Sequence, residues 1–208
     1  MNDDQQAVQL TYVADPMCSW CWGFHPQLQQ VQAKLEGASI DYVMGGLAPD
    51  SSAPMPAEMR EYVQSAWRAV TERTGARFNW DFWTDCEPRR STYPACRAVL
   101  AAARQDEKAR VAMFERIQRA YYLEARNPSI DDTLVELSRD LGLDADRFAL
   151  ELGSEEVKRE LRQEIERCAH LGARSFPSLY LRRGDESRLI AQGYATADEV
   201  LGQVRAAT

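Results

Sequence analysis

The chain has 208 residues, a formal net charge of −7, 45% hydrophobic residues and 27% charged residues. This length and composition are typical of a globular protein that forms one large domain or a domain with an insertion. Basic residues are interspersed with acidic ones, which argues against a nucleic-acid partner, and no apolar run approaches the roughly 20 residues that span a membrane. The polar residues 1–6 lack the apolar run of an export signal, so we expect a cytoplasmic protein.

The first predicted elements are a strand and a helix that flank two cysteines. Residues 8–14 alternate apolar and polar side chains before turning apolar, which indicates a strand, and Pro16 ends it. Apolar residues then recur at spacings of three and four, which predicts a helix closed by Gly37. Cys18 and Cys21, in the sequence Cys-Ser-Trp-Cys, fall at the start of this helix. Unpaired backbone N–H groups and the positive end of the helix dipole both stabilise a thiolate there.

The middle of the chain is predicted to be helical. Residues 40–44 indicate a second strand before it. The predicted helices cover residues 58–74, 96–104 and 110–123, a segment around Leu134 to Leu141 that Ser129 and Asp132 cap, and a segment from Ser154 to Gly172. The irregular stretch 77–94 is rich in aromatic residues. Because clustered aromatic side chains usually pack together, we expect this stretch to form core rather than a groove over the thiols.

The C-terminal segment returns to strands. Residues 178–182 and 188–191 predict a hairpin, and Thr196 begins a capped terminal helix. Pro177 comes directly before the first of these strands. A cis bond at this proline would leave the carbonyl and N–H of Phe176 free for an extended peptide, whereas a trans proline that starts a strand is commoner. The two strand-containing ends must meet to bring Pro177 near the thiols.

Three interpretations of the cysteine pair compete. A zinc site needs two further ligands. The remaining cysteines and histidines are Cys86, Cys96, Cys168, His25 and His170, and none forms a second close-spaced pair. A structural disulfide is disfavoured because cytosolic thiols are normally kept reduced. Redox chemistry at Cys18 and Cys21 is therefore the favoured interpretation, and we expect no metal.

Two motifs carry a resemblance to a known family. The run Asp-Pro-Met-Cys-Ser-Trp-Cys-Trp-Gly-Phe at 15–24, together with Gly-Ala-Arg-Ser-Phe-Pro-Ser at 172–178, resembles the DsbA-like branch of the thioredoxin superfamily, including FrnE-type oxidoreductases. The resemblance covers nearly the whole chain. It implies an α/β architecture, a thioredoxin fold with an inserted all-helical domain. The thioredoxin-like domain would comprise 1–57 and 172–208, and the insertion 58–171, with its last helix packing back on the sheet.

The resemblance also implies roles for individual residues. Cys18 is the expected nucleophile, Cys21 the resolving thiol and Pro177 the cis-proline opposite them. One departure is the dipeptide Ser19-Trp20, where the periplasmic oxidases of the family typically carry Pro-His. This departure argues against strongly oxidising behaviour, because the dipeptide tunes the stability of the thiolate.

Further candidate site residues follow from position. Trp20 and Phe176 are expected to contact substrate. Asp15 is the carboxylate nearest in sequence and is the candidate proton acceptor for Cys21, although Asp before Pro is also a common turn initiator. No cofactor is expected beyond a redox-active disulfide, with glutathione a candidate partner of the thiols.

The expected function is that of a thiol–disulfide oxidoreductase or isomerase acting on protein or small-molecule disulfides. Its expected partners are a disulfide-containing protein or a small thiol, and neither nucleic acid nor a membrane. The same architecture resembles kappa-class glutathione transferases and 2-hydroxychromene-2-carboxylate isomerases. Those relatives typically present serine at the position of Cys18 and lack the second cysteine. A third alternative is a redox-regulated binding module whose thiol pair switches a partner surface.

Overall fold

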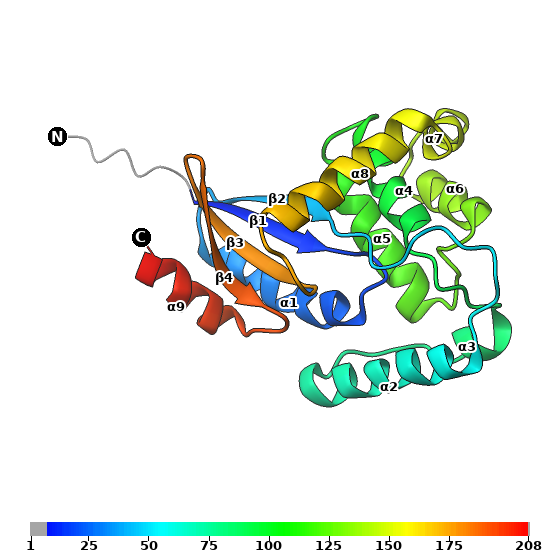
Figure 1. Cartoon of the computed structure of the whole chain (residues 1–208), viewed down its shortest axis with the longest axis horizontal. Coiled ribbons are helices and arrows are strands. Elements are labelled where there is room, and N and C mark those ends of the chain that lie inside the picture. The colour runs from blue at the N-terminus through cyan, green and yellow to red at the C-terminus, as the bar shows by residue number, and fades with distance from the viewer. Residues whose placement is uncertain (1–7, 208) are drawn as a thin grey trace.

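The computed structural model describes residues 8–207, which form a mixed sheet with helices on both faces and a group of helices at one end (Figure 1). The strands are β1 (Gln9–Ala14), β2 (Ser39–Met44), β3 (Ser178–Arg183) and β4 (Glu186–Gln192). The sheet has four strands in the order β2-β1-β3-β4. β1 pairs parallel to β2 and antiparallel to β3, and β3 pairs antiparallel to β4. All the predicted strands are confirmed.

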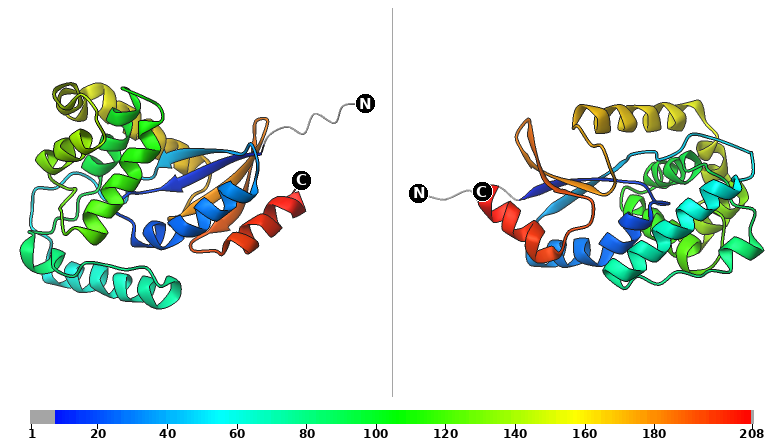
Figure 2. Two further views of the ribbon diagram at one scale, coloured as in Figure 1. Left: turned by 180° about the vertical axis from the view of Figure 1, so that it is seen from behind. Right: turned by 60° about the horizontal axis from the view of Figure 1, so that its bottom comes forward.

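Both faces of the sheet are covered by helices. Helices α1 (Ser19–Lys34) and α9 (Ala197–Ala207) lie on one face and α8 (Glu155–His170) on the other (Figure 2). The alternation along β1 explains this arrangement, because Leu10 and Tyr12 belong to the core shared with α1, whereas Val13 packs with Cys168 of α8. β1 is therefore a central strand buried on both faces.

The remaining helices lie between β2 and β3 in the chain and gather where β1 ends (Figure 1). They are α2 (Ala57–Thr74), α3 (Phe82–Asp85), α4 (Tyr93–Ala103), α5 (Ala109–Leu123), α6 (Asp131–Asp140) and α7 (Ala145–Leu152). Among residues 8–207, no helix has both the length and the apolar character that a membrane crossing requires. This arrangement confirms the thioredoxin-like α/β fold, while the domain boundaries at residues 57 and 172 stay a prediction.

Phe78, Phe82 and Trp83 of the aromatic stretch 77–94 pack in or against a buried cluster, as predicted, whereas Trp80 is 40% exposed. Trp67 of α2 is fully buried and its ring stacks on Phe78 at a centroid distance of 4.8 Å. The rings of Phe82 and Tyr121 form a T-shaped pair with a centroid distance of 4.8 Å. These rings join α2 and α3 to α5 through apolar burial rather than lining an open groove.

The predicted cap of α6 is wrong. Ile130, not Ser129, precedes the first residue of α6, and no side chain caps that end. The Ser129 hydroxyl instead donates to the backbone carbonyl of Ser91 at 2.6 Å. The Ser129 hydroxyl therefore bonds to a distant backbone carbonyl and not to the end of α6. This bond is favoured because a buried carbonyl without a hydrogen bond would destabilise the protein.

Two short helices, α3 and α7, are absent from the sequence-based prediction. α7 spans only eight residues. Its start at Asp144 carries a clear signal in retrospect, because the carboxylate accepts hydrogen bonds from the backbone N–H groups of Asp146 and Arg147. Helices this short show too few turns for a periodic apolar pattern to stand out.

The outer edge of β2 is closed by side chains from the helices. The Glu164 carboxylate of α8 accepts a hydrogen bond from the backbone N–H of Met44 at 2.6 Å. Arg110 of α5 donates to the same carboxylate at 2.8 Å and to the carbonyl of Tyr42 at 3.2 Å. This half-buried ion pair holds α5 and α8 against the strand that leads to the site described below.

Candidate active site

Cys18 lies at the N-cap of α1, in the turn that follows β1. Its backbone N–H donates to the Asp15 carbonyl at 3.0 Å, and its own carbonyl accepts from the N–H of Trp22 at 3.0 Å. No side chain caps the helix, and the first turn carries no acidic residue. No carboxylate or capping side chain therefore stands between Cys18 and the positive end of the helix dipole.

The loop before β3 meets this thiol, as the sequence analysis requires. The Sγ atom of Cys18 lies 3.6 Å from the carbonyl oxygen of Phe176, and the Phe176–Pro177 peptide bond is cis. Antiparallel pairing places the loop there, because Val13 at the end of β1 is opposite Ser178 at the start of β3. The two distant motifs therefore form one site at the end of the sheet.

The two thiols differ in burial. Cys18 keeps 6% of its surface exposed, whereas Cys21 is fully buried. Burial raises the pKa of the Cys21 thiol well above its usual value, and the neighbouring Cys18 raises it further. Cys18 is thus the more exposed of the two thiols, and the raised pKa of Cys21 favours its protonated form.

Three neutral polar side chains of β1 and α5 are buried and form no hydrogen bond of regular geometry with residues 8–207. They are the hydroxyls of Tyr12 and Tyr122 and the amide of Gln118. The Tyr12 hydroxyl acts on Cys21, because it lowers the pKa of that thiol against the larger effect of burial. In turn, burial and the neighbouring thiol of Cys21 raise the pKa of Tyr12. Cys21 therefore has a polar neighbour that the sequence alone did not indicate.

Two of these three side chains, Gln118 and Tyr122, belong to helix α5. Tyr122 stacks on Trp22 of α1 at a centroid distance of 5.6 Å. Two turns earlier on the same face, Phe114 contacts the ring of Tyr12 at 6.2 Å. Gln118 lies between them in sequence at helical spacing, and is fully buried. In sequence, residues at this spacing look like ordinary core positions, so the unpaired amide of Gln118 is seen only in the structure.

The carboxylate of Asp15 is buried and heavily hydrogen-bonded. It accepts from the N–H of Met17 at 2.8 Å, from the N–H of Leu47 at 2.7 Å and from the hydroxyl of Thr92 at 2.6 Å. Burial raises the pKa of Asp15, and these hydrogen bonds oppose the rise. The bonds tie the turn before the thiols to the loop after β2 and to the start of α4. The role of Asp15 as proton acceptor stays a prediction.

The side chains expected to contact substrate flank Cys18. Trp20 and Phe176 are both half-buried and pack against the main core. The other cysteines are dispersed: Cys96 lies 3.5 Å from the Asp15 carboxylate, and Cys86 donates to the carbonyl of Ala125 at 3.0 Å. Within the described part of the chain, no three His, Cys, Asp or Glu side chains gather as metal ligands.

Comparison with known families identifies the fold family. The sequence profile of the DSBA-like thioredoxin domain matches residues 9–204. The chain belongs to this family. This confirms the resemblance inferred from the motifs at 15–24 and 172–178, and the family supports an oxidoreductase.

Solved structures show DSBA-like relatives over the full length. The cytosolic disulfide reductase DsbM from Pseudomonas aeruginosa is 28% identical with a TM-score of 0.79, covering 96% of this chain and 98% of that one. A complex of DsbM with GSH has also been solved. A protein from Nitrosomonas europaea is 27% identical with a TM-score of 0.84, covering 97% of each chain.

A curated relative carries a different description. The ClpXP adapter protein SpxH from Halalkalibacterium halodurans is 27% identical over 157 residues, covering 73% of this chain and 51% of the relative. The chain thus spans about half the length of this curated relative. The DSBA-like fold is therefore similar both to a named reductase and to a named adapter.

Proposed function

We propose that this DSBA-like protein is a thiol–disulfide oxidoreductase that reduces disulfides of proteins or small molecules through Cys18 and Cys21. The observation that carries the proposal is the position of the Cys18 sulfur, 3.6 Å from the Phe176 carbonyl at the start of α1. An extended substrate paired with the loop at Phe176 would present a disulfide next to this sulfur. The buried thiol of Cys21, three residues further along, supplies the second sulfur.

The exchange proceeds in two steps. The Cys18 thiolate attacks one sulfur of the substrate disulfide, which forms a mixed disulfide and releases the other substrate sulfur as a thiolate that takes up a proton. Cys21 then loses its proton and attacks the Cys18 sulfur. The Cys18–Cys21 disulfide forms and the second substrate thiol leaves, so two electrons pass from the protein to the substrate. A small thiol or a dithiol protein must reduce the pair again.

The reducing direction and the compartment rest on similarity. The relative DsbM is titled a cytosolic disulfide reductase and has been solved with GSH. The Ser-Trp dipeptide between the cysteines differs from the Pro-His of the periplasmic oxidases. Both observations support a cytoplasmic reductase with glutathione as candidate reductant. Trp20 and Phe176 would provide its apolar contact for substrate, and Pro177 would hold the loop opposite the thiols.

The decisive experiment follows turnover of insulin disulfides and of a glutathione mixed disulfide with the Cys18→Ser and Cys21→Ser variants. We expect Cys18→Ser to abolish turnover. Cys21→Ser should accumulate a mixed disulfide at Cys18 that mass spectrometry detects in the intact protein. Persistent turnover in Cys18→Ser, or failure to capture any adduct with Cys21→Ser, would overturn the assignment of these roles.

A second candidate is an adapter role, supported by the SpxH similarity and by the exposed ring of Tyr62 on α2. Tyr62 is 66% exposed there. A protein that binds a partner without turnover would show no activity on either disulfide substrate. The transferase alternative predicts glutathione conjugation that survives in Cys21→Ser, since conjugation needs no resolving thiol.

A further inference from the structure

A polar cavity lies beside the thiol site, between the loop that follows β2, the start of α4 and the start of α6. Its volume is about 450 Å³, within the range of small-molecule sites. Serine residues line one wall and are bonded to each other. The Ser91 hydroxyl accepts from the N–H of Ser51 at 3.1 Å, and the Ser129 hydroxyl donates to the Ser91 carbonyl at 2.6 Å. The wall is therefore built by long-range bonds and is not a chance gap.

Two arginines in the lining have unused donors. The Arg97 side chain is only 8% exposed and pairs with Asp50 through Nη1 at 2.8 Å. Its Nε is buried and has no hydrogen-bond partner within residues 8–207, and the same holds for Nε of Arg89. Because these two Nε atoms are enclosed by the protein, a ligand in the cavity would contact the two guanidinium groups through their terminal Nη atoms, and both arginines line the cavity. The planar guanidinium fork matches a carboxylate.

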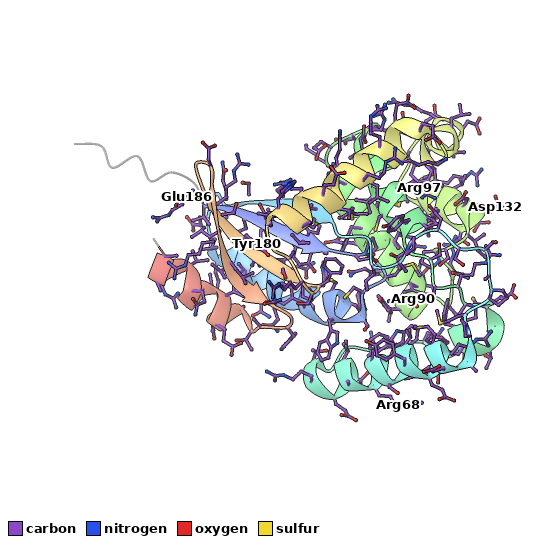
Figure 3. All side chains as sticks on the ribbon, viewed as in Figure 1. Arg68, Arg90, Arg97, Asp132, Tyr180 and Glu186 are labelled. Carbon is purple, nitrogen blue, oxygen red and sulfur yellow. The ribbon has the colours of Figure 1, made fainter. Side chains whose placement is uncertain are left out.

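Acidic residues at the edge of the cavity indicate which kind of ligand it could bind. Asp131 and Asp132 stand exposed at the first turn of α6 and line the same cavity as the arginines. Figure 3 shows Arg97 on α4 and Asp132 on the neighbouring helix α6. A phosphate or a simple dianion would be repelled by these carboxylates. A ligand that carries an ammonium group beside its carboxylate would instead satisfy both signs of charge.

We propose that this cavity binds a small amino-acid-derived zwitterion, with its carboxylate on Arg89 and Arg97 and its ammonium group on Asp131 and Asp132. The proposal does not depend on the thiol chemistry. The cavity nevertheless touches the thiol turn, because the Ser129 hydroxyl lies 3.9 Å from the sulfur of Met17, the residue before Cys18. A bound ligand would therefore sit next to the segment that positions Cys18.

The test measures binding of S-methylglutathione, an amino-acid-derived probe whose blocked sulfur cannot exchange with Cys18. We expect saturable binding by calorimetry that weakens by about tenfold or more in Arg89→Gln and Arg97→Lys, because both changes remove the guanidinium fork. Arg90→Gln is the matched control, since Arg90 is adjacent in sequence and does not line the cavity. Amide resonances of Ser51 and Ser129 should shift on titration. Circular dichroism checks the folding of each variant.

A second comparison isolates the ammonium group. Asp132→Asn should weaken S-methylglutathione binding but leave any binding of glutarate, which has no ammonium group, unchanged or stronger. Absence of saturation at millimolar probe, equal losses in Arg90→Gln, or glutarate binding as tight as the probe would each overturn the proposal. The Cys18→Ser/Cys21→Ser variant should bind the probe as the unaltered protein does. This separates failure of the cavity from failure of the oxidoreductase function.

Discussion

The side chain of Phe176 occupies the space directly over Gly45. A β-carbon built on Gly45 would lie 2.1 Å from Cζ of the Phe176 ring and 2.2 Å from Cε1, distances that real contacts do not show. Gly45 follows β2, and its N–H donates to the Ala14 carbonyl at 2.7 Å. Glycine is thus required at position 45 because the Phe176 ring lies against it. The backbone carbonyl of the same Phe176 contacts Cys18.

The variant Gly45→Ala should displace Phe176 and its carbonyl from the thiol. We expect the rate of disulfide exchange to fall by about tenfold to a hundredfold, as small misplacements at a reacting centre cause. The free energy of unfolding should fall by about 1–3 kcal/mol through overpacking. Stopped-flow kinetics and urea unfolding measure the two effects. Gly202→Ala on α9 is the control, because the nearest atom to its added carbon lies 4.0 Å away and belongs to a flexible arginine. Unchanged exchange in Gly45→Ala would contradict the role given to the Phe176 loop.

The release of substrate from the mixed disulfide should speed up as pH rises. Burial raises the pKa of Cys21 well above its usual value, so its thiolate is a minor species near neutral pH. Below that pKa the thiolate fraction grows about tenfold per pH unit, and the second step should follow it. Single-turnover measurements from about pH 6 to about pH 9 test this directly. A release rate that does not change with pH would show that proton loss from Cys21 does not limit the step.

The variant Tyr12→Phe should slow the second step of the exchange with little effect on the free energy of unfolding. The Tyr12 hydroxyl is buried and interacts with the Cys21 thiol through a weak hydrogen bond at most, so its removal should change the free energy of unfolding by about 1 kcal/mol or less. The hydroxyl also lowers the pKa of Cys21, so the variant should raise that pKa and slow the second step. The exposed Tyr62→Phe serves as control. Normal release kinetics in Tyr12→Phe would exclude this action of the hydroxyl.

Asp15 should make the stability depend on acid pH. Burial raises its pKa in the folded protein, so the folded state holds a proton that the unfolded state has already lost. Its contribution to the free energy of unfolding therefore falls as pH rises from the unfolded pKa through the folded pKa, and is constant above it. The difference in unfolding free energy between the unaltered protein and Asp15→Asn isolates this group. A difference that grows with pH would contradict the assigned direction.

Asp15→Asn should also destabilise the protein at neutral pH by about 1–3 kcal/mol. The Asp15 carboxylate accepts hydrogen bonds from Met17, Leu47 and Thr92. In Asp15→Asn an amide NH₂ group replaces one oxygen, and this group cannot accept a hydrogen bond from the donor that it faces. Thermal unfolding followed by circular dichroism measures the loss. An unchanged midpoint would show that these bonds contribute little.

The sequence carries most of the sheet and the thiol motif because their signals are local. Alternation in residues 8–14 and the Cys-Ser-Trp-Cys run at a helix start need no knowledge of the rest of the chain. The meeting of Cys18 with Phe176 was predicted from the family resemblance and is confirmed. The partners of Asp15 were not predicted, because Leu47 and Thr92 are distant in sequence and carry no pattern.

Side chains with two plausible uses are the ones that the sequence assigned wrongly or missed. Ser129 has the position of a helix cap, yet its hydroxyl bonds to the Ser91 carbonyl. Gln118 has the spacing of a core residue, and its unpaired amide is visible only once burial is known. In both cases the local sequence is compatible with two roles of the side chain, and tertiary packing determines which one it takes.

The closed outer edge of β2 limits how this protein can associate. Glu164 and Arg110 already occupy the Met44 N–H and the Tyr42 carbonyl, so an incoming extended segment cannot pair at this end of the strand. β4 forms the opposite edge of the sheet, and no ion pair between described side chains involves its residues. Addition of a strand from another molecule would therefore meet fewer obstacles at β4, on the side of the molecule where the terminal helix lies.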